Sequence, residues 1–417
     1  MGKPKIRFKG YTEDWEQRKL SDIVSVLDGD RGKNYPTEAD FMEDGHTIFL
    51  NASNITNSGF CFDNTQFITE DKSNSLGNGK LVEGDIVVTS RGSLGHICWY
   101  NAGIARKIPY ARINSGMLIL RNNAEIDTAF LHQYLKSDKG QSQISFMSFG
   151  SAQPQLTKKG VENMSIVFPT KEEEQKQIGI YFSNLDTLIT LHHRKCEETK
   201  KLKKYMLQKM FPQNGQLVPK IRFAGFTEDW EQRKLIDVCD YVDYRGKTPT
   251  KTDSGVFLVT AKNVKDGYID YGVSQEYISE GDYEEVMRRG KPEIGDVLIT
   301  TEAPSGNVAQ VNRADIALAQ RIIKYRGQSN IVDNTYLKCY LLSPEFQNIL
   351  NAKSSGGTVK GIKGSILHQQ EIKYPKYEEQ FKIGSYFNNL DHLITLHQRK
   401  CDELQNMKKY MLQNMFV

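Results

Sequence analysis

The chain has 417 residues, of which 38% are hydrophobic and 25% charged, as in ordinary soluble globular proteins with two or three domains. Its net charge of +4 permits nucleic-acid binding but does not by itself produce tight binding at physiological salt. The longest apolar runs, such as residues 85–89, have the length of a strand, so we expect no membrane span and a cytoplasmic protein. The six cysteines show no Cys-x-x-Cys spacing, which argues against a metal site or disulfides.

The first element, residues 4–20, is repeated almost unchanged at residues 219–235, with differences only at Lys9/Ala224 and Tyr11/Phe226. A second block, residues 174–211, returns at residues 379–416 with 26 of 38 positions identical. Repeats at a fixed offset indicate one structural unit used twice. The chain therefore reads as a constant block, a variable region and a helix, followed by the same three parts again.

Each variable region contains short β-branched or aromatic runs separated by Gly, Asn, Asp and Ser, which predicts strands joined by loops. Helical spacing at residues 128–136 and 335–342 follows these strands, so we predict an α+β fold with two similar, mixed, mostly β domains. Gly84-Asp85 matches Gly295-Asp296, which indicates one shared fold. Divergent surfaces on a shared fold suit two unrelated targets, although drift after duplication is an alternative.

The two helical blocks carry apolar residues in the same heptad register, and we predict that they pair as a coiled coil. In the alternative, each stripe packs only on its own domain. The predicted helix-pairing seam consists of Ile178, Phe182, Leu185, Ile189, His192, Cys196, Ile383, Phe387, Leu390, Ile394, His397 and Cys401.

A helix over residues 171–210 would be about 60 Å long. The short linker Pro212 to Val218 spans at most about 25 Å, so the second domain must follow where the first helix ends. We therefore predict two long helices in an antiparallel coiled coil, a domain at each end, pseudo-two-fold symmetry, and Lys3 close to Val417. The predicted bounds are 1–170 and 219–375 for the domains, 171–211 and 376–417 for the helices, and 212–218 for the linker.

No catalytic, cofactor-binding or metal-binding residue is predicted. The segment Arg245-Gly246-Lys247-Thr248 lacks the upstream glycine of a phosphate-binding loop, and neither an adenosyl-binding Gly-rich turn nor an amino-methyltransferase tetrapeptide is present. Glu371-Ile372-Lys373 matches the end of a nuclease pattern, but the first copy has Met164-Ser165-Ile166 at that place. The seam histidines are interpreted as polar register residues and the seam cysteines as small buried groups.

The layout resembles the specificity subunits of type I restriction–modification systems over the full length of the chain. The resemblance rests on the Phe-x-Gly-aromatic-Thr-x-x-Trp motif at residues 8–15 and 223–230, the Gly-Asp strands, and helices that begin with Glu-Glu-Gln and end in Met-Leu-Gln-x-Met-Phe. It implies two target-recognition domains, each reading half of a bipartite double-stranded DNA site, with the helices setting the gap and docking two modification subunits. It also implies S-adenosylmethionine for those subunits, and ATP and Mg²⁺ for the restriction subunits, with no cofactor in this chain.

Residues that touch DNA have to be chosen by chemistry, because most contacts are phosphate anchors and a few polar side chains reach base edges. We expect them in loops after strands, including Arg-Gly-Lys segments early in both domains. The DNA-binding candidates are Arg31, Lys33, Asn51, Ser53, Asn54, Arg91, Ser93, Gln153, Gln155, Arg245, Lys247, Lys262, Asn263, Glu302, Ser305, Lys360 and Lys363. The alternatives are a helical scaffold with two peptide-binding domains, and a self-sufficient nuclease or methyltransferase.

Overall fold

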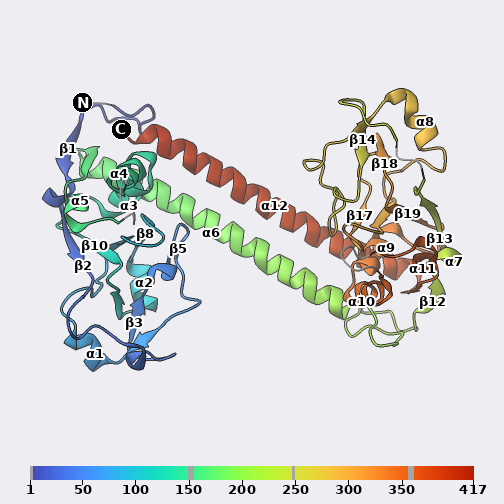
Figure 1. Cartoon of the computed structure of the whole chain (residues 1–417), viewed down its shortest axis with the longest axis horizontal. Coiled ribbons are helices and arrows are strands. Elements are labelled where there is room, and N and C mark those ends of the chain that lie inside the picture. Colours follow the sequence, from blue (N-terminus) through green and yellow to red (C-terminus); the bar gives the residue numbers. More distant parts are fainter. Residues whose placement is uncertain (1–2, 149–154, 247–248, 356–360) are drawn as a thin grey trace. The chain divides into compact units, whose positions relative to one another are not determined.

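The computed structural model describes residues 3–148, 155–246, 249–355 and 361–417. The chain forms two compact units (Figure 1). Unit 1 comprises the residues up to His192 together with Arg399–Val417, and unit 2 comprises His193–Gln398. Each unit therefore contains one β-rich domain and a part of both long helices, so the division falls within the helices.

The β-rich domain of unit 1 is built from two main sheets. The four-stranded sheet has the order β2-β10-β7-β8, with bounds Val24–Asp28, Met117–Asn122, Ile86–Thr89 and Ile97–Trp99. The three-stranded sheet has the order β6-β3-β9, with bounds Phe67–Ile68, Thr47–Leu50 and Ala111–Ile113. Small pairs are β1 (Trp15–Lys19) with β11 (Ser165–Pro169) and β4 (Ile55–Thr56) with β5 (Gly59–Phe60). The α-helices are α1 (Glu70–Ser75), α2 (Ala102–Lys107), α3 (Thr128–Lys136), α4 (Asp138–Ser148) and α5 (Lys158–Glu162), and the 3-10 turns are Leu20–Asp22, Glu38–Asp40 and Ala52–Asn54.

Unit 2 repeats this topology strand for strand in its main sheets. Its four-stranded sheet has the order β13-β19-β16-β17, with bounds Cys239–Asp243, Ile322–Gly327, Val297–Thr300 and Val308–Gln310. Its other sheets are β15-β14-β18 (Tyr277–Ile278, Val256–Val259, Ile316–Leu318) and β12 with β20 (Glu231–Lys234, Glu371–Tyr374). The helices are α7 (Leu235–Val238), α8 (Tyr283–Val286), α9 (Asn334–Leu341), α10 (Pro344–Lys353) and α11 (Gly364–His368), with a 3-10 turn at Glu280–Asp282. The predicted α+β class is confirmed.

The repeated segments, residues 4–20 and 219–235, each bind to the start of the long helix that follows their own β-rich domain. Arg7 makes a bidentate ion pair with Glu174 through contacts of 2.6 and 2.8 Å, and Arg222 pairs with Glu379 in the same way at 2.7 and 2.8 Å. Both glutamates are almost fully buried. Because paired hydrogen bonds to a buried carboxylate are strong and directional, the identical motifs fix the same geometry in both units.

The long helices are α6 (Glu172–Lys209) and α12 (Tyr377–Met415). In unit 1, Cys401 lies against the carbonyl of Ile189, and Lys408 reaches Asp186 further back along α6. Residue numbers therefore rise along α12 as they fall along α6. In unit 2, Cys196 contacts Ile394 and Lys203 contacts Asp391, which gives the same sense. The predicted antiparallel pairing is confirmed within each unit.

The predicted seam is largely buried. Eight of its twelve members are buried, while Ile189, His192, Ile394 and His397 are half-exposed. Gly179 and Gly384 allow α6 and α12 to approach the β-rich domains closely, because a Cβ on Gly179 would lie 2.8 Å from the Cβ of Ala129. On Gly384 it would lie 3.1 Å from the Cβ of Thr335. The stripe thus packs on its own domain as well as on the partner helix, so the alternative in which it packs only on its own domain is wrong.

The two ends of the chain meet in unit 1. The backbone N–H of Ile6 donates to the carbonyl of Asn414 at 3.0 Å, and Figure 1 shows both termini beside the same domain. This agrees with the predicted closeness of Lys3 and Val417. None of the described helices combines the length and apolar sequence needed to cross a membrane. Within the described parts of the chain, no group of His, Cys, Asp and Glu is arranged to hold a metal ion, and all six cysteines are free thiols.

Candidate nucleic-acid interface

In unit 1, most of the sequence-predicted DNA candidates lie on loops that meet at one edge of the sheets. The backbone N–H of Ser90, after β7, donates to Gly116 in the β9–β10 turn at 2.8 Å. Arg31, after β2, donates to the carbonyl of Ser115 in the same turn at 3.2 Å. The N–H of Leu156 donates to Ser90 at 3.0 Å, which brings the segment with Gln155 to the same place.

Unit 2 assembles the equivalent loops in the same way. The N–H of Thr301, after β16, donates to Arg321 before β19 at 2.8 Å, and the N–H of Ile362 donates to Thr301 at 2.9 Å. Gln320 donates to the carbonyl of Gly246, after β13, at 2.6 Å. We call each set of loops the loop edge, namely those after β2, β3, β7 and β9 in unit 1 and after β13, β14, β16 and β18 in unit 2.

The arginines of the two Arg-Gly-Lys segments fold back onto the aspartate that ends the preceding strand. Arg31 lies 3.5 Å from Asp28, and Arg245 lies 2.5 Å from Asp243. The sheet register makes Asp28 and Asp243 equivalent positions. Arg31 lies three residues after Asp28, whereas Arg245 lies two residues after Asp243, so the two arginines are not at equivalent positions. Burial raises the pKa of Asp243, but the hydrogen bonds and charge of Arg245 outweigh it and lower that pKa overall. A DNA phosphate would have to compete with these carboxylates.

Two predicted DNA contacts, Asn54 and Asn263, are corrected by the structure. Asn54 is 1% exposed, and its amide donates to the carbonyls of Cys61 and Asn64 at 2.9 and 3.1 Å. Asn263 is 0% exposed and donates to Asp270 and Val273 at 3.0 and 2.6 Å. The two asparagines bond to carbonyls seven and ten residues further along the chain. They hold equivalent loops together and are not available to bases.

We expect Asn263→Ala to lower the free energy of unfolding by about 1–3 kcal/mol, because two carbonyls and the Thr260 backbone N–H lose a buried partner. Urea unfolding measures this loss. The neighbouring Lys262→Ala is the matched control, since Lys262 is exposed. A loss of sequence preference in Asn263→Ala without a loss of stability would restore the original DNA-contact interpretation.

The other candidates vary in their accessibility. Asn51 uses its side chain to cap the Ala52–Asn54 turn, accepting from the N–H and hydroxyl of Ser53 at 2.9 and 2.6 Å. Gln155 and Ser305 are half-exposed. The exposed candidates are Arg31, Lys33, Ser53, Arg91, Ser93, Arg245, Lys262, Glu302 and Lys363. Gln153, Lys247 and Lys360 lie outside the described residues, so nothing tests their prediction.

The structure adds residues that the sequence analysis missed. Arg321 lies on the loop edge of unit 2 with a φ of +69°, in the tight turn between β18 and β19. The run from Leu318 to Tyr325 is mostly apolar and is typical of a single strand, so the sequence pattern does not reveal this turn. The signal that could have revealed it is the polar pair Gln320-Arg321 inside an otherwise apolar run.

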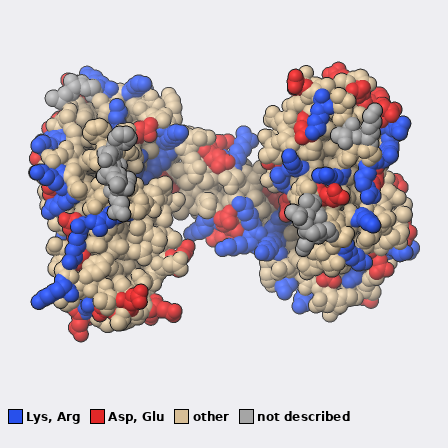
Figure 2. Space-filling model, viewed as in Figure 1, with Lys and Arg blue, Asp and Glu red and all other residues tan. Residues whose placement is uncertain are grey.

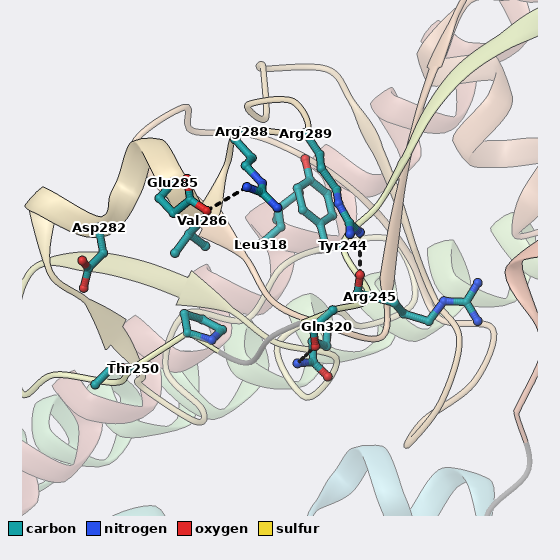
Figure 3. Close-up of a pocket in the computed structure, with 12 residues that line it drawn as sticks. Tyr244, Arg245, Thr250, Asp282, Glu285, Val286, Arg288, Arg289, Leu318 and Gln320 are labelled. Atoms are coloured by element: carbon teal, nitrogen blue, oxygen red, sulfur yellow. Dashed lines mark hydrogen bonds and ion pairs between the residues drawn. The ribbon is translucent and has the colours of Figure 1, made fainter.

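A cavity of about 220 Å³ lies behind the Arg245 loop, with Arg288 and Arg289 on one side and Gln320 on the other (Figure 3). Arg289 donates to the backbone carbonyls of Asp243 and Arg245 at 2.9 and 2.5 Å, and Arg288 pairs with Glu285 at 3.0 Å. Arg289 is therefore engaged in holding the loop, whereas Arg288 forms a local pair with Glu285 of α8. The residues that line the cavity, Arg289 above all, stabilise the backbone of the loop edge. Their side chains do not indicate a separate ligand.

Basic and acidic side chains are interspersed over much of the visible surface, and Lys and Arg gather where the long helices meet the β-rich domain of unit 2 (Figure 2). The formal net charge of the whole chain is only +4. A surface of this kind gives a modest non-specific attraction for DNA, since that term grows with the number of phosphates neutralised. Selective contacts from the loop edges would then matter more than overall charge.

Comparison with known proteins identifies the family. The family described as type I restriction modification DNA specificity domain matches residues 12–201 and again residues 227–406. The MjaVIII type I restriction enzyme specificity subunit of Methanocaldococcus jannaschii is 25% identical over 96% of this chain and 91% of its own length. The putative MjaX specificity subunit of the same organism is 23% identical over 96% and 92%.

Solved structures agree in fold. The type I restriction–modification S subunit of M. genitalium covers 100% of this chain and 99% of its own, with a TM-score of 0.66 at 15% identity. A chain from a structural study of complex assembly and conformational transition of the type I R-M system covers 96% and 97%, with a TM-score of 0.51 at 19% identity. Because two copies of the family domain together span most of the sequence, the chain belongs to the type I restriction–modification DNA specificity family.

Proposed function

We propose that the loop edge of each β-rich domain reads one half of a bipartite double-stranded DNA site, and that α6 and α12 set the gap between the halves. One observation carries the proposal: the two loop edges have equivalent backbones but different side chains. The β7–β8 and β16–β17 loops both run seven residues, from Ser90 to His96 and from Thr301 to Asn307. Arg91 in the first loop corresponds to Glu302 in the second.

The test exchanges one loop edge. Replacing residues 20–168 with the same region of a relative keeps β1 and, of β11, only Pro169. The exchange should change one half of the recognised sequence and leave the other intact. Mapping methylated adenines across the genome of cells that carry the chimaera with its modification partner measures both halves. An altered sequence in both halves would contradict independent reading by the two domains.

As a type I specificity subunit, the chain is the non-catalytic component of its system and assembles with other components and DNA. The finer composition is part of the proposal: two modification subunits that use S-adenosylmethionine, and restriction subunits that use ATP and Mg²⁺, acting on DNA in the cytoplasm. Purified chain alone, given DNA, Mg²⁺ and S-adenosylmethionine, should neither cut nor methylate. The peptide-binding scaffold is not favoured, because the family model that matches both halves of the chain describes a DNA specificity domain.

The paired helices offer an equivalent apolar surface in each unit. In unit 1 the exposed side chains are Leu188, Met407 and Tyr410, which are 42%, 48% and 58% exposed. In unit 2 the corresponding ones are Leu393, Leu202 and Tyr205, which are 41%, 45% and 50% exposed. Leu188 follows seam residue Leu185 by three positions, and Met407 follows Leu404, which is buried in the core of unit 1, by three. Both are therefore rotated equally from the buried face of their helix. Two like surfaces suit two copies of one partner, which supports docking of two modification subunits.

We expect the double variant Tyr205→Glu/Tyr410→Glu to lose most binding of the modification subunits, because a carboxylate at the centre of an apolar interface remains desolvated and unpaired. Size-exclusion chromatography of the co-expressed subunits measures the complex. The single variants provide the control, since each should leave one docking surface and yield a complex with one modification subunit fewer. Full-size complex from the double variant would contradict this assignment.

A further inference from the structure

Glu302 and Arg321 stand side by side on the loop edge of unit 2. Glu302 follows β16 and Arg321 precedes β19, and the Nε of Arg321 lies 3.5 Å from the Oε2 of Glu302. Their side chains are 50% and 55% exposed. The separation exceeds the 2.7–2.9 Å that is typical of charge-assisted hydrogen bonds. Both groups therefore keep hydrogen-bonding capacity directed at solvent.

The backbone that presents these two side chains is well fixed. The N–H of Thr301 donates to the carbonyl of Arg321, and the N–H of Ile362 donates to the carbonyl of Thr301. Glu302 forms a β-bridge with Gly361, and a Cβ at Gly361 would lie only 2.6 Å from the Cγ of Glu302. The glycine lets the stem of Glu302 lie close against this strand-like segment. Both side chains thus project from segments tied to one another.

The carboxylate of Glu302 differs in charge from the exposed residues around it. The other exposed candidates of this loop edge are the cations Arg245, Lys262 and Lys363. A carboxylate is repelled by DNA phosphates, so it contributes to DNA binding only where it meets a hydrogen-bond donor. In the major groove the amino group of cytosine is the donor that Glu and Asp accept from, while Arg pairs with O6 and N7 of guanine.

We propose that Glu302 and Arg321 together read one guanine–cytosine base pair in the half-site of the second domain, an inference that rests on the proposed function. Arg321 donates to guanine O6 and N7, and Glu302 accepts from cytosine N4. In a guanine–cytosine pair O6 and N4 are hydrogen-bonded neighbours, about 2.9 Å apart. A donor and an acceptor held 3.5 Å apart on the protein match that spacing.

The first domain does not carry this pair. With the strands aligned, Arg91 occupies the place of Glu302, and Gly116 occupies the place of Arg321. Gly116 accepts from the N–H of Ser90 just as Arg321 accepts from that of Thr301. The backbone contact is thus shared, while the acid–arginine pair belongs to unit 2. The proposal therefore concerns one half of the site only.

The experiment expresses the chain with its modification partner in cells and maps methylated adenines genome-wide. Glu302→Gln and Arg321→Ala should each relax the same single guanine–cytosine position in one half-site, by about 5- to 150-fold in preference. The other half and the remaining positions should stay unchanged. The control is Asp315→Asn, which breaks an exposed pair with Arg313 (Nε to Oδ1 2.7 Å) before β18, whereas Arg321 follows that strand. It should leave the motif as it is.

The outcomes distinguish a failure of the base-pair assignment from a failure of the proposed DNA-reading function. If the unmodified chain yields no bipartite motif, the proposed function fails. If it yields one, and the two variants leave it unchanged or alter different positions, the base-pair assignment alone is overturned. A uniform loss of methylation at all sites would also overturn it, because that pattern marks a phosphate contact.

Discussion

Phe416→Ala should destabilise unit 1 by about 3–5 kcal/mol, the range found when a buried phenylalanine is truncated. Phe416 is 3% exposed, and its ring centroid lies 5.4 Å from that of Phe130, 5.8 Å from Tyr134 and 5.6 Å from Phe182. It comes from the end of α12, whereas its neighbours come from α3 and α6. Its removal therefore leaves a cavity where the end of the chain closes the core, and urea unfolding followed by circular dichroism measures the loss.

Phe211 is the equivalent phenylalanine of unit 2, so the effects of the two truncations can be compared within one chain. Phe211 packs on Trp230, Tyr336, Tyr340 and Phe387, so Phe211→Ala should cost unit 2 a similar amount. Tyr410→Ala is the control, because Tyr410 lies on the same helix as the residues before Phe416 and is 58% exposed. Equal losses for Tyr410→Ala and Phe416→Ala would show that the aromatic core does not depend on the helix end.

The paired helices and the placement of the domains on them could be predicted because the segments that form these contacts occur twice in the sequence. The seam residues, the Arg-Phe segment near the N-terminus and the terminal Met-Phe all recur in the second half of the chain, and their apolar or ion-pairing chemistry leaves few alternatives. Burial then follows, with Phe182 and Phe387 both 0% exposed. The antiparallel sense could also be predicted, since Pro212 to Val218 is too short to let the chain return along a whole helix.

The loop edges could be predicted only by location. Asn51 and Asn54 are both polar residues after β3, yet one caps a turn and the other is buried beneath the following loop. Which of the two faces solvent depends on where residues 61 and 64 pass, and local sequence does not encode that path. Arg321 was missed for a related reason, because its exposure arises from a turn between two strands of different sheets.

Reversing the charge of Asp186 should weaken the helix pair in unit 1 by about 3–5 kcal/mol, because it removes the partner of a buried cation. Lys408 on α12 is 9% exposed and lies 2.6 Å from Asp186 on α6, and Gln133 also donates to Asp186 at 2.9 Å. In Asp186→Lys, the new cation would face Lys408. Denaturant unfolding of the single variants and of Asp186→Lys/Lys408→Asp gives the coupling, and the double variant should recover part of the loss.

The equivalent pair in unit 2 is Lys203 of α6 with Asp391 of α12 at 2.5 Å. In both units, therefore, an ion pair of this kind joins the two helices. Glu197→Gln is the control, since its pair with Lys200 is exposed and worth less than about 1 kcal/mol. No recovery in the double variant would contradict a direct pair.

The same contact predicts a dependence on pH. Burial raises the pKa of Asp186, but the charges of Lys408 and Lys136 and the hydrogen bonds from Lys408 and Gln133 outweigh it, so that the pKa is lowered overall. A carboxyl whose pKa is lower in the folded state contributes stability above its unfolded pKa of about 3.9, and loses it as the pH falls through the folded value. Asp186→Asn should therefore be less stable than the unmodified chain at neutral pH, and the difference should shrink in acid below about pH 4. A difference that stayed constant down to pH 2 would mean that Asp186 acts through packing and not through its charge.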